Sequence, residues 1–296
     1  MLDRLLSILA ADWLITNDSV LSYVPAFIAF LNGGKFDLKV LDEKKPHVMA
    51  FNTDGSPKPI NVVNPWRLDD PNIPENSVAI IPIQDVILSW KTMQLVNDIN
   101  TSKCNPNINS ILFAVSSPGG MTSQLDIAAT AIKNLPIPTV AVIFEMSASA
   151  AMWLTSAMTY RIATSPMDQI GSIGAKTTYK DYSGLFKDKL GIVETDFYAS
   201  KSTKKDAAIR AFLENGDKTL MTEKIDFVNE YFHSTIQKNL GISRDSEVFS
   251  GDIFFAEKAK ELGLINEINT MDYALNYAYT LGLTNKISNF SKNFNR

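Results

Sequence analysis

Short apolar runs alternate with stretches of helical spacing from about residue 76 onward, and this alternation constrains the fold more than any other feature. Strands are expected at 78–83, 111–115, 139–144, 160–163 and 193–198, and helices at 92–101, 122–135, from about 149, at 182–190 and over 218–240. Short apolar runs separated by helices of this kind are typical of βαβ units, which build a mainly parallel sheet. The sequence therefore predicts an α/β fold.

The regions on either side of this alternation differ from it. Apolar helical stretches at 2–15 and 26–31 precede a segment at 36–74 that is rich in Asp, Lys, Asn and Pro. We expect a helical and irregular N-terminal extension over 1–75, a main domain over 76–270, and a C-terminal helix with a polar, frayed tail over 271–296. The apolar helices of the extension need burial, which predicts a homo-oligomer.

The first apolar stretch is interrupted by acidic residues, and the second is shorter than the roughly 20 residues that cross a bilayer. We therefore expect a cytoplasmic protein without a membrane span. The chain has 28 Lys and Arg against 32 Asp and Glu, a net charge of −4, and no long basic cluster. This balance argues against nucleic acid as a partner, because neutralising phosphates needs clustered cations.

The numbers of cysteines and histidines are too small for a disulfide framework or a zinc centre. With one cysteine, Cys104, and two histidines, His47 and His233, the chain has neither a disulfide framework nor the ligands of a Cys/His zinc centre. Neither histidine lies in a metal or catalytic motif. Catalysis by this chain would therefore use a base other than imidazole.

Two local motifs follow expected strands. The first, SSPGG at 116–120, places paired glycines at the carboxyl edge of the sheet, where backbone N–H groups can face an anion. The second, EMSASAAMW at 145–153, places serines at the start of a helix, where the helix dipole favours a developing oxyanion. Taken alone, a tight turn explains the first motif and helix N-caps explain the second.

Two further motifs follow along the chain. GSIG at 171–174 brackets a serine between glycines, and KSTKKD at 201–206 gathers three lysines. Taken alone, these motifs are explained by a turn and by a solvated loop.

The order of the four motifs resembles the signal peptide peptidase A family of serine peptidases. That family carries SPGG, a segment like AASGG, GSIG or GSLG, a Lys-Asp pair, and a late stretch similar to EVFSG at 247–251 followed by GLINE at 263–267. The resemblance covers about 76–270 and implies the Clp-protease/crotonase fold, a spiral of βαβ units.

The resemblance implies a role for individual residues around the serine. Ser149 would be the nucleophile, because SASAA at 147–151 matches AASGG, with Ser147 displaced by two positions. Gly119 or Gly120, together with the N–H of Ala150, would form the oxyanion hole. Alanines stand at 150 and 151 where the family has glycines, which changes the shape of the substrate pocket.

The resemblance also implies a lysine base. Lys205 is favoured because Lys205 and Asp206 match the Lys-Asp pair of the family, with Lys204 and Lys201 as alternatives, and Ser172 would orient the lysine. A free lysine has a pKa near 10.4, so a base at neutral pH needs that value lowered by about three units. We therefore expect Lys205 to be packed away from water. No metal or organic cofactor is required.

These expectations define a Ser/Lys peptidase acting on a protein or peptide. The first 75 residues do not contain the single membrane anchor common in cellular members, and with the modest length this resembles the phage and prophage branch, which implies scaffold or capsid proteins as substrates. Two alternatives remain open: a crotonase-type acyl-CoA enzyme, for which Glu145 is the nearby carboxylate, and a catalytically inert assembly protein on the same fold.

Overall fold

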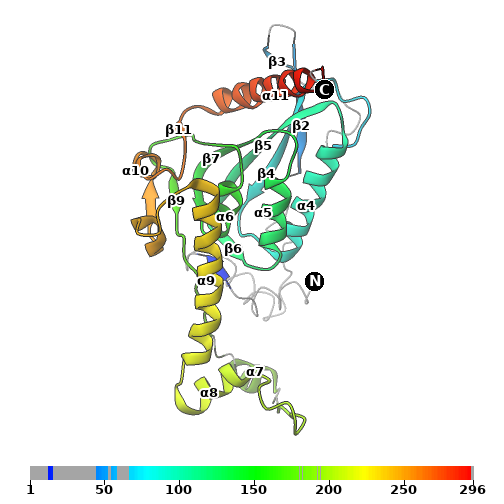
Figure 1. Ribbon diagram of the computed structural model, residues 1–296. Coiled ribbons are helices and arrows are strands. Elements are labelled where there is room, and N and C mark those ends of the chain that lie inside the picture. The colour runs from blue at the N-terminus through cyan, green and yellow to red at the C-terminus, as the bar shows by residue number, and fades with distance from the viewer. Residues whose placement is uncertain are drawn as a thin grey trace.

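The computed structural model describes residues 13–15, 45–52, 55–58, 67–179, 181, 183–191, 193 and 195–294. In these residues a nine-stranded, mostly parallel sheet carries helices on both faces (Figure 1), which confirms the predicted α/β class. Its strands run in the order β10-β9-β7-β5-β4-β2-β3, and β8 joins β11 to β7.

The strands of this sheet are β2 (His47–Phe51), β3 (Pro57–Lys58), β4 (Ser77–Gln84), β5 (Ile108–Ser117), β7 (Thr139–Ala148), β8 (Tyr160–Ala163), β9 (Gln169–Gly171), β10 (Ile253–Phe255) and β11 (Glu267–Ile268). A separate pair joins β1 (Trp13–Ile15) to β6 (Gly119–Met121). The helices are α4 (Ser89–Cys104), α5 (Leu125–Lys133), α6 (Ala150–Ser156), α7 (Ser183–Leu190), α8 (Ala207–Asn215), α9 (Thr219–Leu240), α10 (Ala256–Glu261) and α11 (Met271–Phe294), with a 3₁₀ turn η2 (Glu247–Ser250).

The central strands β4, β5 and β7 are parallel and buried on both faces, which explains their nearly continuous apolar sequence. Successive residues of β5 alternate between two cores. Phe113 belongs to the core under α4, α5 and α6, whereas Leu112 packs against Ala274 and Ala278 of α11. The sheet therefore lies between two helical layers.

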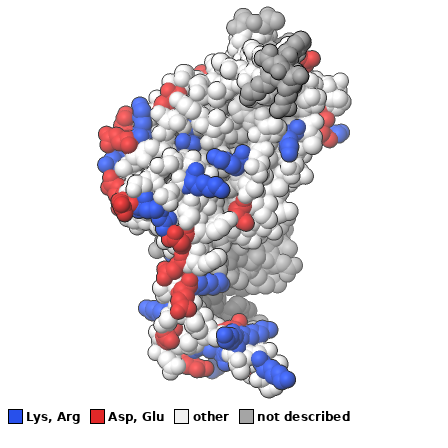
Figure 2. Space-filling model, viewed as in Figure 1, with Lys and Arg blue, Asp and Glu red and all other residues white. Residues whose placement is uncertain are grey.

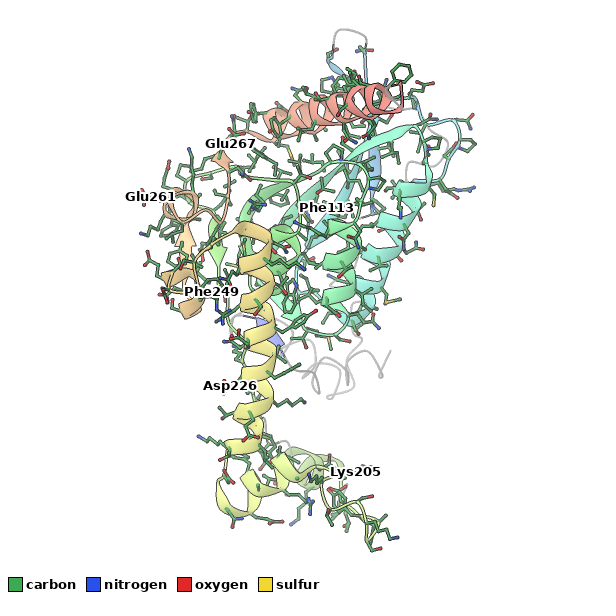
Figure 3. The ribbon with its side chains drawn as sticks, in the orientation of Figure 1. Phe113, Lys205, Asp226, Phe249, Glu261 and Glu267 are labelled. Atoms are coloured by element: carbon green, nitrogen blue, oxygen red, sulfur yellow. The ribbon has the colours of Figure 1, made fainter. Side chains whose placement is uncertain are left out.

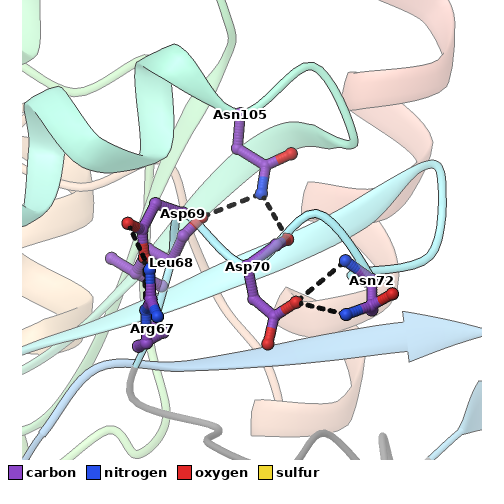
Figure 4. Close-up of polar contacts among 6 residues, drawn as sticks. All are labelled: Arg67, Leu68, Asp69, Asp70, Asn72 and Asn105. Atoms are coloured by element: carbon purple, nitrogen blue, oxygen red, sulfur yellow. Dashed lines mark hydrogen bonds and ion pairs between the residues drawn. The ribbon is translucent and has the colours of Figure 1, made fainter.

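The connection into β4 is held by side-chain amides rather than by a helix (Figure 4). Asn105 Nδ2 donates to the carbonyls of Leu68 at 2.9 Å and Asp70 at 3.1 Å, and the backbone N–H of Asn72 donates to the Asp70 carboxylate at 2.9 Å. Leu68 is 2% exposed. This irregular segment before β4 therefore packs against the core.

Helix α9 leaves the core and carries α7 and α8 at its far end (Figure 1). Its carboxyl-terminal half buries Phe232 and Ile236, and Phe232 stacks on Trp153 with ring centroids 4.8 Å apart. None of the described side chains of α8 is buried. We call the projecting part, the described residues of 183–228, the arm.

Three local expectations differ from the structure. The described residues of 193–198 form no strand, since their apolar side chains lie on the arm without a neighbouring strand. The expected frayed tail is helical through Phe294, although its side chains from Lys286 to Ser291 are exposed. Trp13–Ile15 pairs with β6 as a strand instead of continuing a helix; the rest of the two predicted N-terminal helices lies outside the described residues.

Two features are absent from the described residues. None of the helices there is both long and apolar enough to cross a membrane. Within the same part of the chain, no group of three His, Cys, Asp or Glu side chains is placed to hold a metal ion.

Candidate active site

Ser149 lies at the junction where β7 ends and α6 begins. Its backbone has φ 55° and ψ −116°, a region that non-glycine residues rarely adopt. The side chain makes no capping hydrogen bond, although Ser149 precedes the helix, so the N-cap explanation of this serine fails. A strained serine on a sharp strand-to-helix turn is the geometry of a nucleophile elbow.

The strained turn is held by its neighbours. The N–H of Ser149 donates to the carbonyl of Gly171 at 2.8 Å, and its own carbonyl accepts from the N–H of Trp153 at 3.0 Å. Ser149 is 1% exposed, and it lines a cavity of about 350 Å³. A hydroxyl at this position is therefore shielded from bulk water but reaches an open space.

Ser147, the other serine of the segment, has a structural role. It is fully buried in β7, opposite Ser117 of β5, and its Oγ lies 3.2 Å from Thr155 Oγ1. Its hydroxyl therefore has a partner inside the core. The comparison favours Ser149 over Ser147 as the reactive serine.

The glycine turn at 119–120 lies at the same edge of the sheet. Strands β5 and β7 are adjacent, and α6, which begins at Ala150, contacts β6. A Cβ on Gly120 would lie 2.0 Å from the carbonyl oxygen of Ile87, so only glycine fits there. The N–H of Ile87 donates to the Gly119 carbonyl and the N–H of Met121 to the Ile87 carbonyl, both at 2.8 Å. The turn is therefore pinned to the β4–α4 loop.

Two N–H groups of the predicted oxyanion hole differ in their surroundings. The N–H of Gly119 donates to Ser117 Oγ at 3.2 Å. Ala150 is the first residue of α6, and the first N–H groups of a helix have no partner within it. The N–H of Ala150 is therefore suited to donate to an oxyanion formed on a carbonyl that Ser149 attacks, whereas the N–H of Gly119 already has an acceptor.

Ser172 stands beside Ser149. Strand β9 pairs with β7 so that Ala148 lies opposite Gly171, and the next residues are the two serines. Gly171 has φ 128°, and a Cβ there would lie 2.7 Å from the carbonyl oxygen of Asp252. Ser172 donates its N–H to the same carbonyl at 2.6 Å and lines the Ser149 cavity. The structure thus brings Ser149 and Ser172 together.

The three candidate lysines lie elsewhere. Lys201, Lys204 and Lys205 are all exposed, in the turn that precedes α8. Figure 3 shows Lys205 on the arm, beyond Asp226, whereas Phe249, which lines the Ser149 cavity, lies beside the sheet. The expectation that Lys205 is packed away from water against Ser172 is not met within one chain, because α9 carries the arm outward.

One lysine that the sequence analysis did not single out does line the cavity. Lys176 follows GSIG by two residues and borders both the Ser149 cavity and a second cavity of about 440 Å³, which Lys204 also lines. The shared wall includes Ala175, whose N–H donates to Asn229 Oδ1 at 3.0 Å. Only the position of Lys176 two residues after GSIG could have indicated it from the sequence.

The carboxylate required by the crotonase alternative is engaged elsewhere. Glu145 Oε2 accepts from Ser116 Oγ at 2.9 Å, and the Glu145 N–H donates to the buried Asp168 carboxylate at 2.8 Å. Glu145 is not among the residues that line the Ser149 cavity. An acyl-CoA enzyme with Glu145 as its base is therefore not supported.

These features define an α/β protein whose site is built around a serine at a strained strand-to-helix turn. A family model described as "Peptidase family S49" matches residues 131–283, more than half of the chain, and the chain belongs to that family. This finding confirms, at the level of the family, the resemblance seen in the sequence. The fold agrees with the Clp/crotonase type.

Two curated relatives carry protease names. The chain is 26% identical over 187 residues to "Putative protease MJ0651" of Methanocaldococcus jannaschii, covering 61% of this chain and 58% of that protein. It is 23% identical over 258 residues to "Protease 4" of Haemophilus influenzae, covering 81% of this chain and 41% of that protein. The chain thus spans about half the length of these relatives. Family and relatives together support a peptidase.

Proposed function

We propose that the chain is a serine endopeptidase in which Ser149 is the nucleophile and Lys205 of a second copy is the base. The observation that carries the proposal is the backbone strain at Ser149, which no capping bond explains. Strain of this kind persists where the surrounding structure enforces it, and it is concentrated at active sites.

A second copy would supply Lys205, because within one chain this lysine is exposed on the arm. The arm that carries Lys205 exposes large apolar side chains: Phe197 is 93%, Phe227 74% and Leu213 58% exposed. Apolar surface of this kind favours burial against a partner. An arm seated on a neighbouring copy would bury these side chains and remove water from the lysine, as a neutral lysine base requires. Figure 2 shows charged groups of both signs along the same arm.

The proposed reaction proceeds in two steps. The neutral lysine amine takes the proton of Ser149 Oγ as the oxygen attacks the peptide carbonyl, and the N–H of Ala150 donates to the resulting oxyanion. The ammonium then protonates the leaving amine, which produces an acyl-enzyme. In the second step the lysine takes a proton from water as the water oxygen attacks the ester, and the ammonium then returns that proton to Ser149 Oγ as the C–O bond breaks and the acid product leaves.

The substrates and the cellular location of the protein are also part of this proposal. Protein or peptide substrates follow from the family, whereas phage scaffold or capsid proteins as substrates, and a cytoplasmic location, rest on the sequence resemblance and composition alone. An inert assembly protein is the competing account.

Hydrolysis of an unfolded, fluorophore-quenched protein tests the proposal. We expect Ser149→Ala and Lys205→Ala to reduce kcat by at least about 10³-fold, in keeping with the loss of a nucleophile or its base. Lys201→Ala is the matched control and should retain activity. Full activity in Ser149→Ala or Lys205→Ala contradicts the assignment, and an inactive wild-type chain supports the inert alternative.

A further inference from the structure

His233 is a buried histidine that the proposed reaction does not use. It lies in the part of α9 that packs on the core and is 8% exposed. Its Nε2 lies 3.1 Å from the carbonyl oxygen of Ile173, which is 60 residues away in the sequence. Ile173 stands between Ser172 and Gly174, and both of these residues line the Ser149 cavity. The imidazole thus holds the loop that forms one wall.

The same imidazole contacts a second wall of the cavity. Its ring centroid lies 4.9 Å from that of Phe249, with the planes tilted by 48°, and Phe249 lines the cavity. The guanidinium of Arg244 lies over Phe249 at 5.3 Å from the ring centroid. Two segments that meet at the cavity, the GSIG loop and η2, therefore both rest on His233.

Packing of α9 on the core does not by itself call for an imidazole. The Trp153–Phe232 stack attaches this part of the helix, and Asn239 Nδ2 donates to Ser156 Oγ at 3.0 Å further along it. Neither contact involves a residue that lines the cavity. An apolar side chain at this position would be enough to pack α9 on the core. The buried imidazole also reaches a loop carbonyl, which points to a role in positioning the loop.

We propose that His233 is a positioning residue, whose neutral imidazole fixes the GSIG loop and Phe249 relative to Ser149. The inference rests on the proposed peptidase function. In the neutral ring the Nε2–H donates to the Ile173 carbonyl, and Nδ1 carries no proton. His233 itself does not contact the reacting atoms.

The charges around the ring favour this neutral form. Burial lowers the pKa of His233, the hydrogen bond to Ile173 raises it, the Arg244 guanidinium lowers it and the Glu230 carboxylate raises it. Glu230 is itself paired with Arg244. Protonation would therefore place a second positive charge in a buried site beside Arg244.

Three variants of the full chain test the proposal. His233→Gln keeps an N–H donor near the position of Nε2 but cannot titrate, whereas His233→Leu removes the donor. Asn239→Leu, the matched control, removes a hydrogen bond between α9 and the core that does not reach the cavity. Because misplacement by about 1 Å can cost 10²-fold, we expect kcat to fall at least about tenfold in His233→Leu and to recover in His233→Gln. Asn239→Leu should lower Tm without lowering kcat.

Two results overturn the inference while leaving the proposed function intact. One is wild-type kcat in His233→Leu, and the other is a kcat in His233→Gln as low as in His233→Leu. If His233→Leu fails to fold, the pH dependence of kcat decides. The decrease of wild-type kcat toward acidic pH should include one titrating group that is absent in His233→Gln. Identical pH profiles of the two proteins contradict the proposal. An inactive wild-type chain instead refutes the proposed function.

Discussion

Replacing Ser149 by glycine should make the protein more stable while abolishing its activity. The backbone at φ 55° and ψ −116° is easy for glycine and costly for serine. A residue held in such a region costs about 1–3 kcal/mol, and the greater freedom of glycine in the unfolded chain offsets about 0.5–1 kcal/mol of the relief. We therefore expect the free energy of unfolding of Ser149→Gly to exceed that of Ser149→Ala by about 0–2.5 kcal/mol.

Urea denaturation followed by circular dichroism measures this difference. Ser149→Ala keeps the strained backbone and should stay within about 0.5 kcal/mol of wild type, as substitutions without a disruptive mechanism usually do. The matched pair is Ser147→Gly and Ser147→Ala, because Ser147 lies in β7 and its φ is not positive. Here glycine should be less stable than alanine by about 1 kcal/mol. The reasoning is refuted if Ser149→Gly is also less stable than Ser149→Ala.

Three further predictions concern the turn, the histidine and the assembly. Gly120→Ala should destabilise the fold by about 1–3 kcal/mol, as overpacking does, because its Cβ would meet the Ile87 carbonyl at 2.0 Å; an unchanged urea midpoint contradicts this. Burial lowers the pKa of His233 in the folded state, so the unfolded chain takes up a proton first as pH falls below about 6.5. Wild type should therefore lose stability below that pH relative to His233→Gln, and parallel stability curves would show that the ring is not buried in its neutral form. Co-refolding Ser149→Ala with Lys205→Ala should restore about a quarter of wild-type hydrolysis if a neighbouring copy supplies the lysine, and no restoration in assembled mixtures excludes that supply.

The fold was predictable wherever a strand is buried on both faces. The continuous apolar residues of β4, β5 and β7 indicate parallel strands without knowledge of their partners. The segment at 193–198, VETDFY, was also predicted to be a strand, but Val193 is 75% and Phe197 93% exposed. Strand formation there would need a neighbouring strand, which composition cannot reveal.

The candidate site was predictable where it consists of short motifs that follow strands. The order of the motifs indicated Ser149 and Ser172, and the structure places both at one cavity. The parts that the sequence could not supply come from distant segments. His233 reaches Ile173 across 60 residues, and Phe249 reaches the cavity from the turn after α9. The position of Lys205 on the arm depends on the direction of α9, which no local pattern encodes.

Covalent labelling with a fluorophosphonate, followed by mass spectrometry of the digested protein, tests the central claim most directly. We predict one adduct, on Ser149. It should be absent in Ser149→Ala, form much more slowly in Lys205→Ala, and form at the wild-type rate in Ser147→Ala. An adduct on a different serine, or peptide hydrolysis by a chain in which Ser149 stays unlabelled, would contradict the account.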